Sequence, residues 1–224
     1  MNQSPIRLSS KLALPLASPS DLLSIEYSEN GSYAGEFDKE GNLVLGPDAP
    51  VVKFRGRAFQ LSKVHIHLMS EHIVDDEKQG DYEIHFVHIP RGGTASDPKL
   101  VIGIIYRESE SAKSREGFTK FANGLPSRAA LKEMRTDEAA VEYEITPSHF
   151  FPLIPASETP DFQNWFHYEG SLTSFPFSED VSWFVMKSEA LVNPADTADL
   201  EQYAEHHARE LQPLNRRLVM RSFT

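Results

Sequence analysis

The stretch of residues 63–88, KVHIHLMSEHIVDDEKQGDYEIHFVH, holds five of the chain's nine histidines. His65 and His67 are separated by one residue in a strand-like segment, and His85 lies in a second such segment, residues 82–89. Residues i and i+2 of a strand point to the same face, about 6.6 Å apart. An antiparallel return of the second segment would bring His85 opposite the first pair on one sheet face.

Three imidazoles that converge in this way can bind one divalent cation. Three protein ligands leave a coordination position for water, which is typical of a catalytic zinc site. The chain has no cysteine, so disulfides and thiolate metal sites are excluded. Histidine and carboxylate ligands favour zinc or harder ions. From spacing alone, strand histidines satisfied by ordinary hydrogen bonds are the alternative to a metal site.

The rest of the chain is predicted to form short strands separated by turns, with a helical pattern in few places. Asn30-Gly31 marks a turn after the first strand. This pattern indicates one α+β or mostly β domain. The predicted strands are residues 22–29, a hairpin at 36–46, then 57–68, 82–89, 100–107, 164–168, 181–187 and 218–223, and the predicted helices are 114–125, 127–140 and 195–212.

Charge and hydropathy narrow the range of partners. Twenty-two basic against 33 acidic residues give a net charge of −11, which disfavours nucleic-acid binding. No apolar run reaches the ~20 residues that span a bilayer, so we expect no membrane partner. The start, MNQSPIRLSS, is not a signal peptide, which predicts a cytoplasmic protein, or a periplasmic or secreted one if the chain is a processed or truncated form. Monomer and homodimer are both compatible with the sequence.

With these residues in view, the chain resembles the α-class carbonic anhydrases. The family's H-x-H, S-E-H-x-V-D and E-x-H-x-V-H motifs match residues 65–67, 70–75 and 83–88. Its G-S-L-T-x-x-P segment and V-x-W strand match residues 170–183, and Q-S-P-I matches residues 3–6. The resemblance covers the whole chain in order. It implies one domain over residues 1–224, α+β and mostly β, with a large central mixed, mainly antiparallel sheet and short peripheral helices.

The resemblance also implies a reaction: zinc-dependent, reversible hydration of carbon dioxide to bicarbonate and a proton by a zinc-bound hydroxide. His65, His67 and His85 would be the Zn²⁺ ligands. Glu83, on the same sheet face, would accept an imidazole N–H from a ligand histidine. The Thr173 hydroxyl would accept a hydrogen bond from the hydroxide and donate its own to Glu71.

Further residues would form a pocket for the small apolar substrate. Val87 shares the face of His85, and sulfonamides or anions are the expected inhibitors. His72 and His88 are interpreted as hydrogen-bonded structural residues. The predicted substrate-binding residues are Val87, Val101, Leu172, Ser174, Val181 and Trp183.

The chain departs from the family pattern in four places. Ser32 follows Asn30-Gly31 where the fastest members have a proton-shuttling histidine, and serine does not titrate near neutral pH. Leu68 replaces a tryptophan, Arg216 replaces an asparagine, and the aromatic segment before Q-S-P-I is absent. A non-catalytic carbonic-anhydrase-like binding module is therefore the alternative function, and esterase activity is a possible side reaction.

Overall fold

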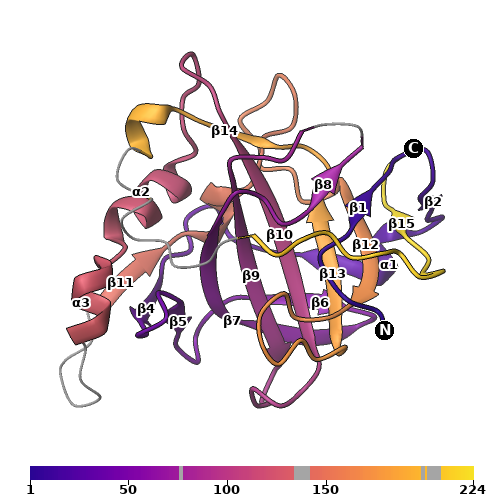
Figure 1. Ribbon diagram of the computed structural model, residues 1–224, viewed down its shortest axis with the longest axis horizontal. Coiled ribbons are helices and arrows are strands. Elements are labelled where there is room, and N and C mark those ends of the chain that lie inside the picture. Colours follow the sequence, from indigo (N-terminus) through magenta and orange to yellow (C-terminus); the bar gives the residue numbers. More distant parts are fainter. Residues whose placement is uncertain (76–77, 134–141, 198–199, 201–207) are drawn as a thin grey trace.

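Long strands at the centre of the molecule carry the histidines. The computed structural model describes residues 1–224 except 76–77, 134–141, 198–199 and 201–207. Within this part of the chain a 13-stranded mixed sheet forms the body of the molecule (Figure 1). Its main path runs in the order β11 (Glu142–Ile145), β4 (Tyr33–Phe37), β5 (Leu43–Leu45), β7 (Arg57–Leu68), β9 (Tyr82–Pro90), β10 (Lys99–Glu108), β13 (Val181–Met186), β12 (Trp165–Gly170), β15 (Met220–Arg221) and β2 (Leu14–Pro15).

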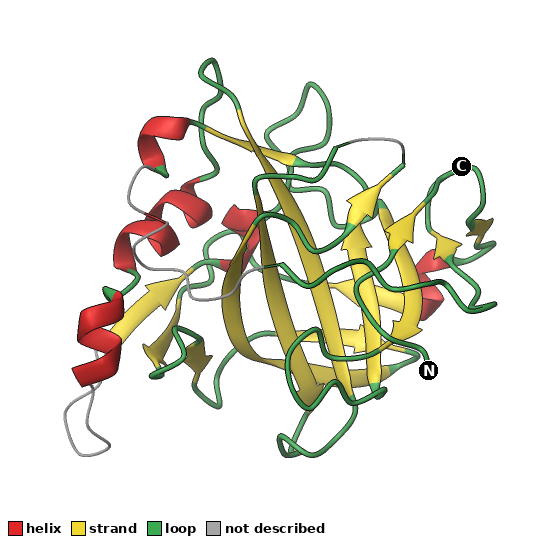
Figure 2. Cartoon of the chain, viewed as in Figure 1, coloured by secondary structure: helices red, strands yellow, loops and turns green. Residues whose placement is uncertain are grey.

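The remaining elements lie beside this path. β6 (Val51–Phe54) joins β3 (Leu23–Ile25) to β7, β14 (Ala190–Val192) pairs with β10, and β1 (Arg7–Leu8) forms a separate parallel pair with β8 (Ile73–Val74). Figure 2 shows the helices at the periphery of the sheet. They are α1 (Pro19–Leu22), α2 (Glu116–Gly124), α3 (Arg128–Glu133) and the 3₁₀ helices η1 (Pro147–Phe150) and η2 (Pro194–Asp196).

The three central strands follow from their sequences. β7 alternates apolar and polar residues, so one face packs into a core while the other presents the histidines. β9 and β10 are buried over almost their whole length, as strands covered on both faces are. β7 pairs antiparallel with β9, and β9 pairs antiparallel with β10.

Two apolar clusters pack on opposite faces of this sheet. The larger one contains the β9 residues Ile84 and Phe86, whose side chains point away from His85. The smaller one contains Val87 and Trp183, on the histidine face. The histidines therefore rise from a sheet whose other side is a fixed core.

The predicted fold class is confirmed, and most strand predictions match within one or two residues. The strands expected at 22–29 and 218–223 are shorter than predicted. The helix expected at 195–212 is not found in its described ends: residues 194–196 form η2 and residues 208–212 are irregular. Between these ends the described residue Leu200 is helical, as predicted, whereas residues 198–199 and 201–207, and residues 134–140 of the other predicted helix, lie outside the described residues. No helix within the described ranges is long and apolar enough to cross a membrane.

The interpretation of His88 as a structural residue has a direct physical basis. The ring is fully buried, its Nδ1–H donates to the Leu100 carbonyl oxygen at 3.2 Å, and its Nε2 accepts from the Tyr27 hydroxyl. These partners suit the neutral ring. Burial lowers the pKa of the His88 imidazole from 6.5 to about 4.

We expect this histidine to make stability depend on pH. Below about pH 6.5 the unfolded chain binds a proton at His88 that the folded chain rejects until the pH approaches 4, so stability falls between these values. The metal-free chain should lose about 2 kcal/mol of unfolding free energy from this group between about pH 7.5 and pH 5. Urea unfolding at both pH values checks this, with His88→Gln as the reference. An equal loss in both proteins would contradict the prediction.

Candidate metal centre

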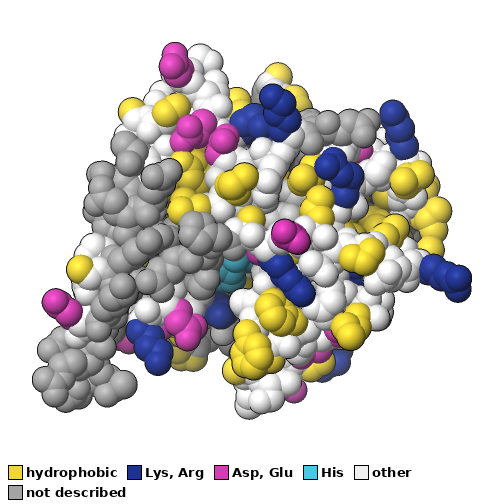
Figure 3. All heavy atoms as spheres, viewed as in Figure 1, with side chains coloured by type: hydrophobic (Ala, Val, Ile, Leu, Met, Phe, Trp, Pro, Cys, Tyr) yellow, Lys and Arg dark blue, Asp and Glu magenta, His cyan; other side chains and the backbone are white. Residues whose placement is uncertain are grey.

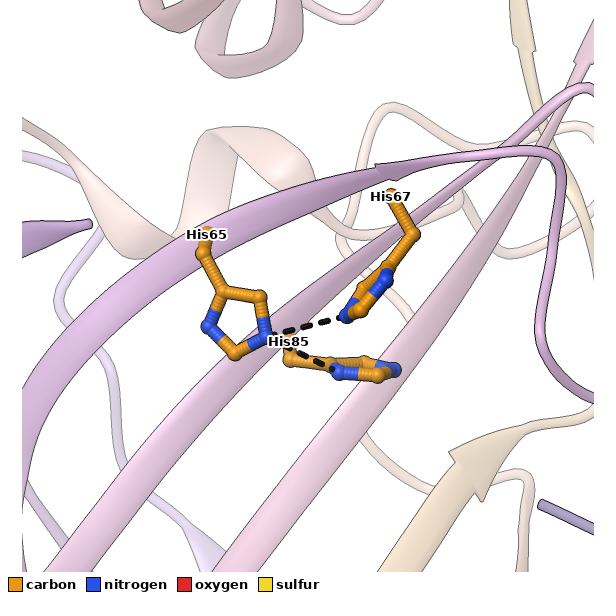
Figure 4. Close-up of side chains that lie close together, drawn as sticks. All are labelled: His65, His67 and His85. Atoms are coloured by element: carbon orange, nitrogen blue, oxygen red, sulfur yellow. Dashed lines mark hydrogen bonds between the residues drawn. The ribbon is translucent and has the colours of Figure 1, made fainter. Parts of the chain in front are cut away.

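The three predicted ligand histidines meet at one point above the sheet. In the β7–β9 register His65 is the partner of His85, and His67 is two residues further along β7. His65 Nε2 lies 3.1 Å from His67 Nε2 and 3.3 Å from His85 Nδ1, and Figure 4 shows these nitrogens turned toward one another. Nitrogen ligands about 2.0–2.1 Å from a tetrahedral zinc ion lie about 3.3 Å apart, so this spacing fits that ion.

Glu83 determines which nitrogen of His85 is available. Its Oε1 lies 2.9 Å from His85 Nε2 and 2.7 Å from His72 Nδ1, and its Oε2 accepts the backbone N–H groups of Glu71 and His72 at 2.8 Å each. An ionised carboxylate only accepts, so His85 Nε2 carries the proton and Nδ1 keeps its lone pair for a cation. His72, Glu83 and His85 also lie close enough together to hold a metal ion, but their facing atoms already form the hydrogen bonds just described.

The electrostatics of Glu83 support the ionised form. Burial by itself would raise its pKa, but the charge and hydrogen bonds of His72 and the hydrogen bond from His85 hold the pKa well below its usual range. Glu83 is completely buried. A buried carboxylate is tolerable only because four donors satisfy it.

Glu71 is the second buried carboxylate of the site. Its Oε1 accepts the backbone N–H of Arg209 at 3.0 Å, whereas its Oε2 has no hydrogen-bond partner in the described part of the chain and lies 3.5 Å from His67 Nε2. Burial raises the pKa of Glu71, and His85, Thr173 and Arg209 partly offset this. Thr173 is thus among the groups that lower the pKa of Glu71, although no hydrogen bond from a described residue reaches Oε2.

The apolar wall is a straight row across three strands. Val87 on β9 is the partner of Val101 on β10, which is in turn the partner of Trp183 on β13. The row shares the histidine face, and the Trp183 ring lies 4.9 Å from the His85 ring. Val181 is buried in the same cluster, and Leu172 packs against it. Ser174 is exposed on the loop after β12.

Figure 3 shows histidine atoms in a recess of the face drawn, with Lys or Arg side chains close by. His67 and His85 are buried and His65 is half-buried, so the ligand nitrogens sit below the surface. A recess with an apolar wall and few polar groups is the usual form of a small-molecule site.

Three residues at the site were not predicted from the sequence to act there. Tyr168 contacts His72 Nε2 at 2.7 Å and donates to Ser4 Oγ at 2.9 Å, which extends the Glu83 network to the N-terminal segment. The guanidinium of Arg209 donates to the Ser4 carbonyl at 2.8 Å. The Q-S-P-I match included Ser4 but gave no indication of these two contacts, because Tyr168 and Arg209 are 164 and 205 residues away from it in the sequence.

Known proteins place the chain in a family. A sequence model of the eukaryotic-type carbonic anhydrases matches residues 1–223. A carbonic anhydrase of Nostoc sp. is 29% identical over 204 residues, which cover 91% of this chain and 69% of that protein. Dioscorin DB3L of Dioscorea polystachya is 27% identical over 165 residues, covering 72% of this chain and 54% of that protein.

A solved structure agrees with these sequence matches. The α-carbonic anhydrase of Thermovibrio ammonificans, determined with the inhibitor sulfanilamide, superimposes with a TM-score of 0.68 and 26% identity. The match covers 98% of this chain and 86% of that one. The chain therefore belongs to the eukaryotic-type carbonic anhydrase family.

Proposed function

We propose that this chain is a zinc-dependent carbonic anhydrase that catalyses the reversible hydration of carbon dioxide to bicarbonate and a proton. The observation that carries the proposal is the convergence of three imidazole nitrogens at the spacing of tetrahedral zinc ligands. His65 and His67 would bind zinc through Nε2, and His85 through Nδ1. Zinc, when bound, would lower the pKa of water so that hydroxide is available near neutral pH.

The remaining residues have separate roles in this proposal. Glu83 holds His85 in the tautomer that leaves Nδ1 free of a proton. Glu71 offers Oε2 as an acceptor for the Thr173 hydroxyl, so that the Thr173 oxygen is left to accept a hydrogen bond from the attacking water. The apolar row of Val87, Val101 and Trp183 offers carbon dioxide a surface with little competition from water.

Family membership alone leaves the reaction open, because the relatives include dioscorin DB3L, which is not named as a carbonic anhydrase. A non-catalytic binding module on the same fold is therefore the second candidate. The intact histidine triad, with its supporting carboxylates Glu71 and Glu83, supports the enzyme. Hydrolysis of small esters by the same site would be a side activity.

Two substitutions should separate metal binding from chemistry. His85→Ala removes a ligand and should lower zinc affinity more than about 100-fold, with nearly all activity lost. Thr173→Ala should keep one zinc per chain and slow hydration about 100-fold, since it removes a positioned hydrogen-bonding group. Zinc analysis and stopped-flow hydration, with and without a sulfonamide, provide the measurements. Full activity of Thr173→Ala would refute its role, and one zinc per chain in a parent without hydration would favour the binding module.

The position of the Glu83 carboxylate should require a glycine at residue 103. Gly103 is the β10 partner of His85, and a Cβ added there would stand 2.7 Å from Glu83 Oε1. That oxygen already accepts from two histidines, so Gly103→Ala must displace it. Zinc affinity should fall about 10- to 100-fold with unchanged far-ultraviolet circular dichroism. Gly46→Ala, whose added Cβ would meet nothing nearer than 4.0 Å, is the control. Parent-like zinc affinity in Gly103→Ala would contradict this expectation.

The serine at the shuttle position should make turnover depend on buffer. Ser32 is exposed and its hydroxyl donates to Glu144 Oε2 at 3.1 Å. A serine hydroxyl, unlike an imidazole, does not exchange protons near neutral pH. Hydration at saturating carbon dioxide should rise with the concentration of 1,2-dimethylimidazole buffer, and Ser32→His should weaken that dependence. Stopped-flow rates of the parent that are insensitive to buffer would mean that another residue moves the proton.

A further inference from the structure

The apolar row beside the histidines continues into a lysine. Lys63 on β7 is the cross-strand partner of Val87 on β9 and precedes His65 by two residues. On its other side it is the partner of Val44 on β5. Partners in a sheet share a face, so Lys63 rises from the face that carries the histidines and the apolar wall.

A bulge in β7 produces this orientation. Leu61 is the partner of His88 and Lys63 is the partner of Val87. β7 therefore advances by two residues where β9 advances by one. Leu61 belongs to the core on the opposite face, and without the bulge Lys63 would point into that core as well. Bulges near functional sites commonly re-aim a side chain, and here the side chain is a cation next to the metal ligands.

The charge of Lys63 has no counter-ion in the described part of the chain. It is half-buried, between Val44 and Val87, and no described carboxylate lies within 4.0 Å of its Nζ. Glu36 on β4 is the partner of Val44, two strand spacings from Lys63, or about 10 Å. Three of the other lysines do have carboxylate partners: Lys53 with Glu26, Lys99 with Asp180 and Lys120 with Glu116.

We propose that Lys63 strengthens the binding of the anionic ligand of the site, bicarbonate. The inference rests on the proposed function and identifies a residue that distinguishes the charged ligand from neutral carbon dioxide. A lysine acts on an anion as a point charge, and a recess with apolar walls carries its field further than bulk water does. The chain as a whole carries a net charge of −11, which disfavours anions, so a positive charge beside the histidines offsets this locally.

Equilibrium anion affinity is the appropriate measurement. The equilibrium constant of the overall reaction fixes the ratio of kcat/KM for hydration and dehydration. Comparing these two rates therefore cannot reveal the effect of the Lys63 charge. The probe is thiocyanate, titrated into the cobalt(II)-loaded chain and followed by visible absorption. At an ionic strength of about 0.02 M, Lys63→Gln should raise the thiocyanate Kd about three- to tenfold, and about 0.5 M sodium sulfate should remove most of the difference.

Four comparisons make the test specific for charge. Lys63→Arg should bind thiocyanate within about twofold of the parent, and Glu36→Gln should bind it more tightly, the opposite direction. Lys53→Gln makes the same change in net charge, but Lys53 is the partner of Ala58, five residues or about 16 Å along β7 from Lys63. It should leave the Kd unchanged. The Kd of the neutral ligand imidazole should not respond to Lys63→Gln.

The proposal is overturned if Lys63→Gln binds thiocyanate like the parent at low ionic strength, or if Lys63→Arg loses as much affinity as Lys63→Gln. It is also overturned if the parent hydrates carbon dioxide but binds no thiocyanate. A parent that binds thiocyanate in a Lys63-dependent way but does not hydrate carbon dioxide would remove the proposed function and leave Lys63 as an anion-binding residue.

Discussion

The pairing of β7 with β9 is the constraint on which the rest of the site depends. The register that sets His65 opposite His85 also sets His67 opposite Glu83 and Lys63 opposite Val87. A slip of one residue would turn every one of these side chains to the other face. The core residues Ile66, Ile84 and Phe86, buried on the far side, oppose such a slip, because it would expose them. Hydrophobic burial on one face thus determines the positions of the histidines on the other.

Burying polar groups beneath the histidines is costly, and the structure offsets that cost through hydrogen bonds. Glu83 is satisfied by four donors, and His72 passes the network on to Tyr168 and Ser4. Such a network is rigid because removing one partner leaves a buried group unsatisfied. Glu71 differs, since its Oε2 has no hydrogen-bond partner among the described residues. A fully satisfied carboxylate suits orientation of a ligand, and an incompletely satisfied one suits interaction with the reacting groups.

Local pattern was enough to predict the strands that hold the site, because alternation and turn residues are local signals. The bounds of β7 follow directly from its alternating residues, and β9 and β10 are only slightly longer than predicted. The bulge before Lys63 and the space that Gly103 leaves for Glu83 could not be predicted in this way. Both depend on which strand lies alongside, a contact between residues distant in sequence. The contact of Arg209 with Glu71 spans 138 residues and has no local signal.

Under the proposed function, the same cross-strand row would let one small recess accept both a neutral gas and an anion. Trp183, Val101 and Val87 present apolar surface, and the next position in the row is occupied by Lys63. Carbon dioxide carries no net charge and would gain from the apolar residues, whereas bicarbonate would gain from the lysine. Adjacent positions in a sheet lie about 4.8 Å apart, so both effects reach the space above the histidines without competing for the same atoms. A regular sheet with one bulge is therefore sufficient to place an apolar surface, three converging histidines and a fixed charge side by side.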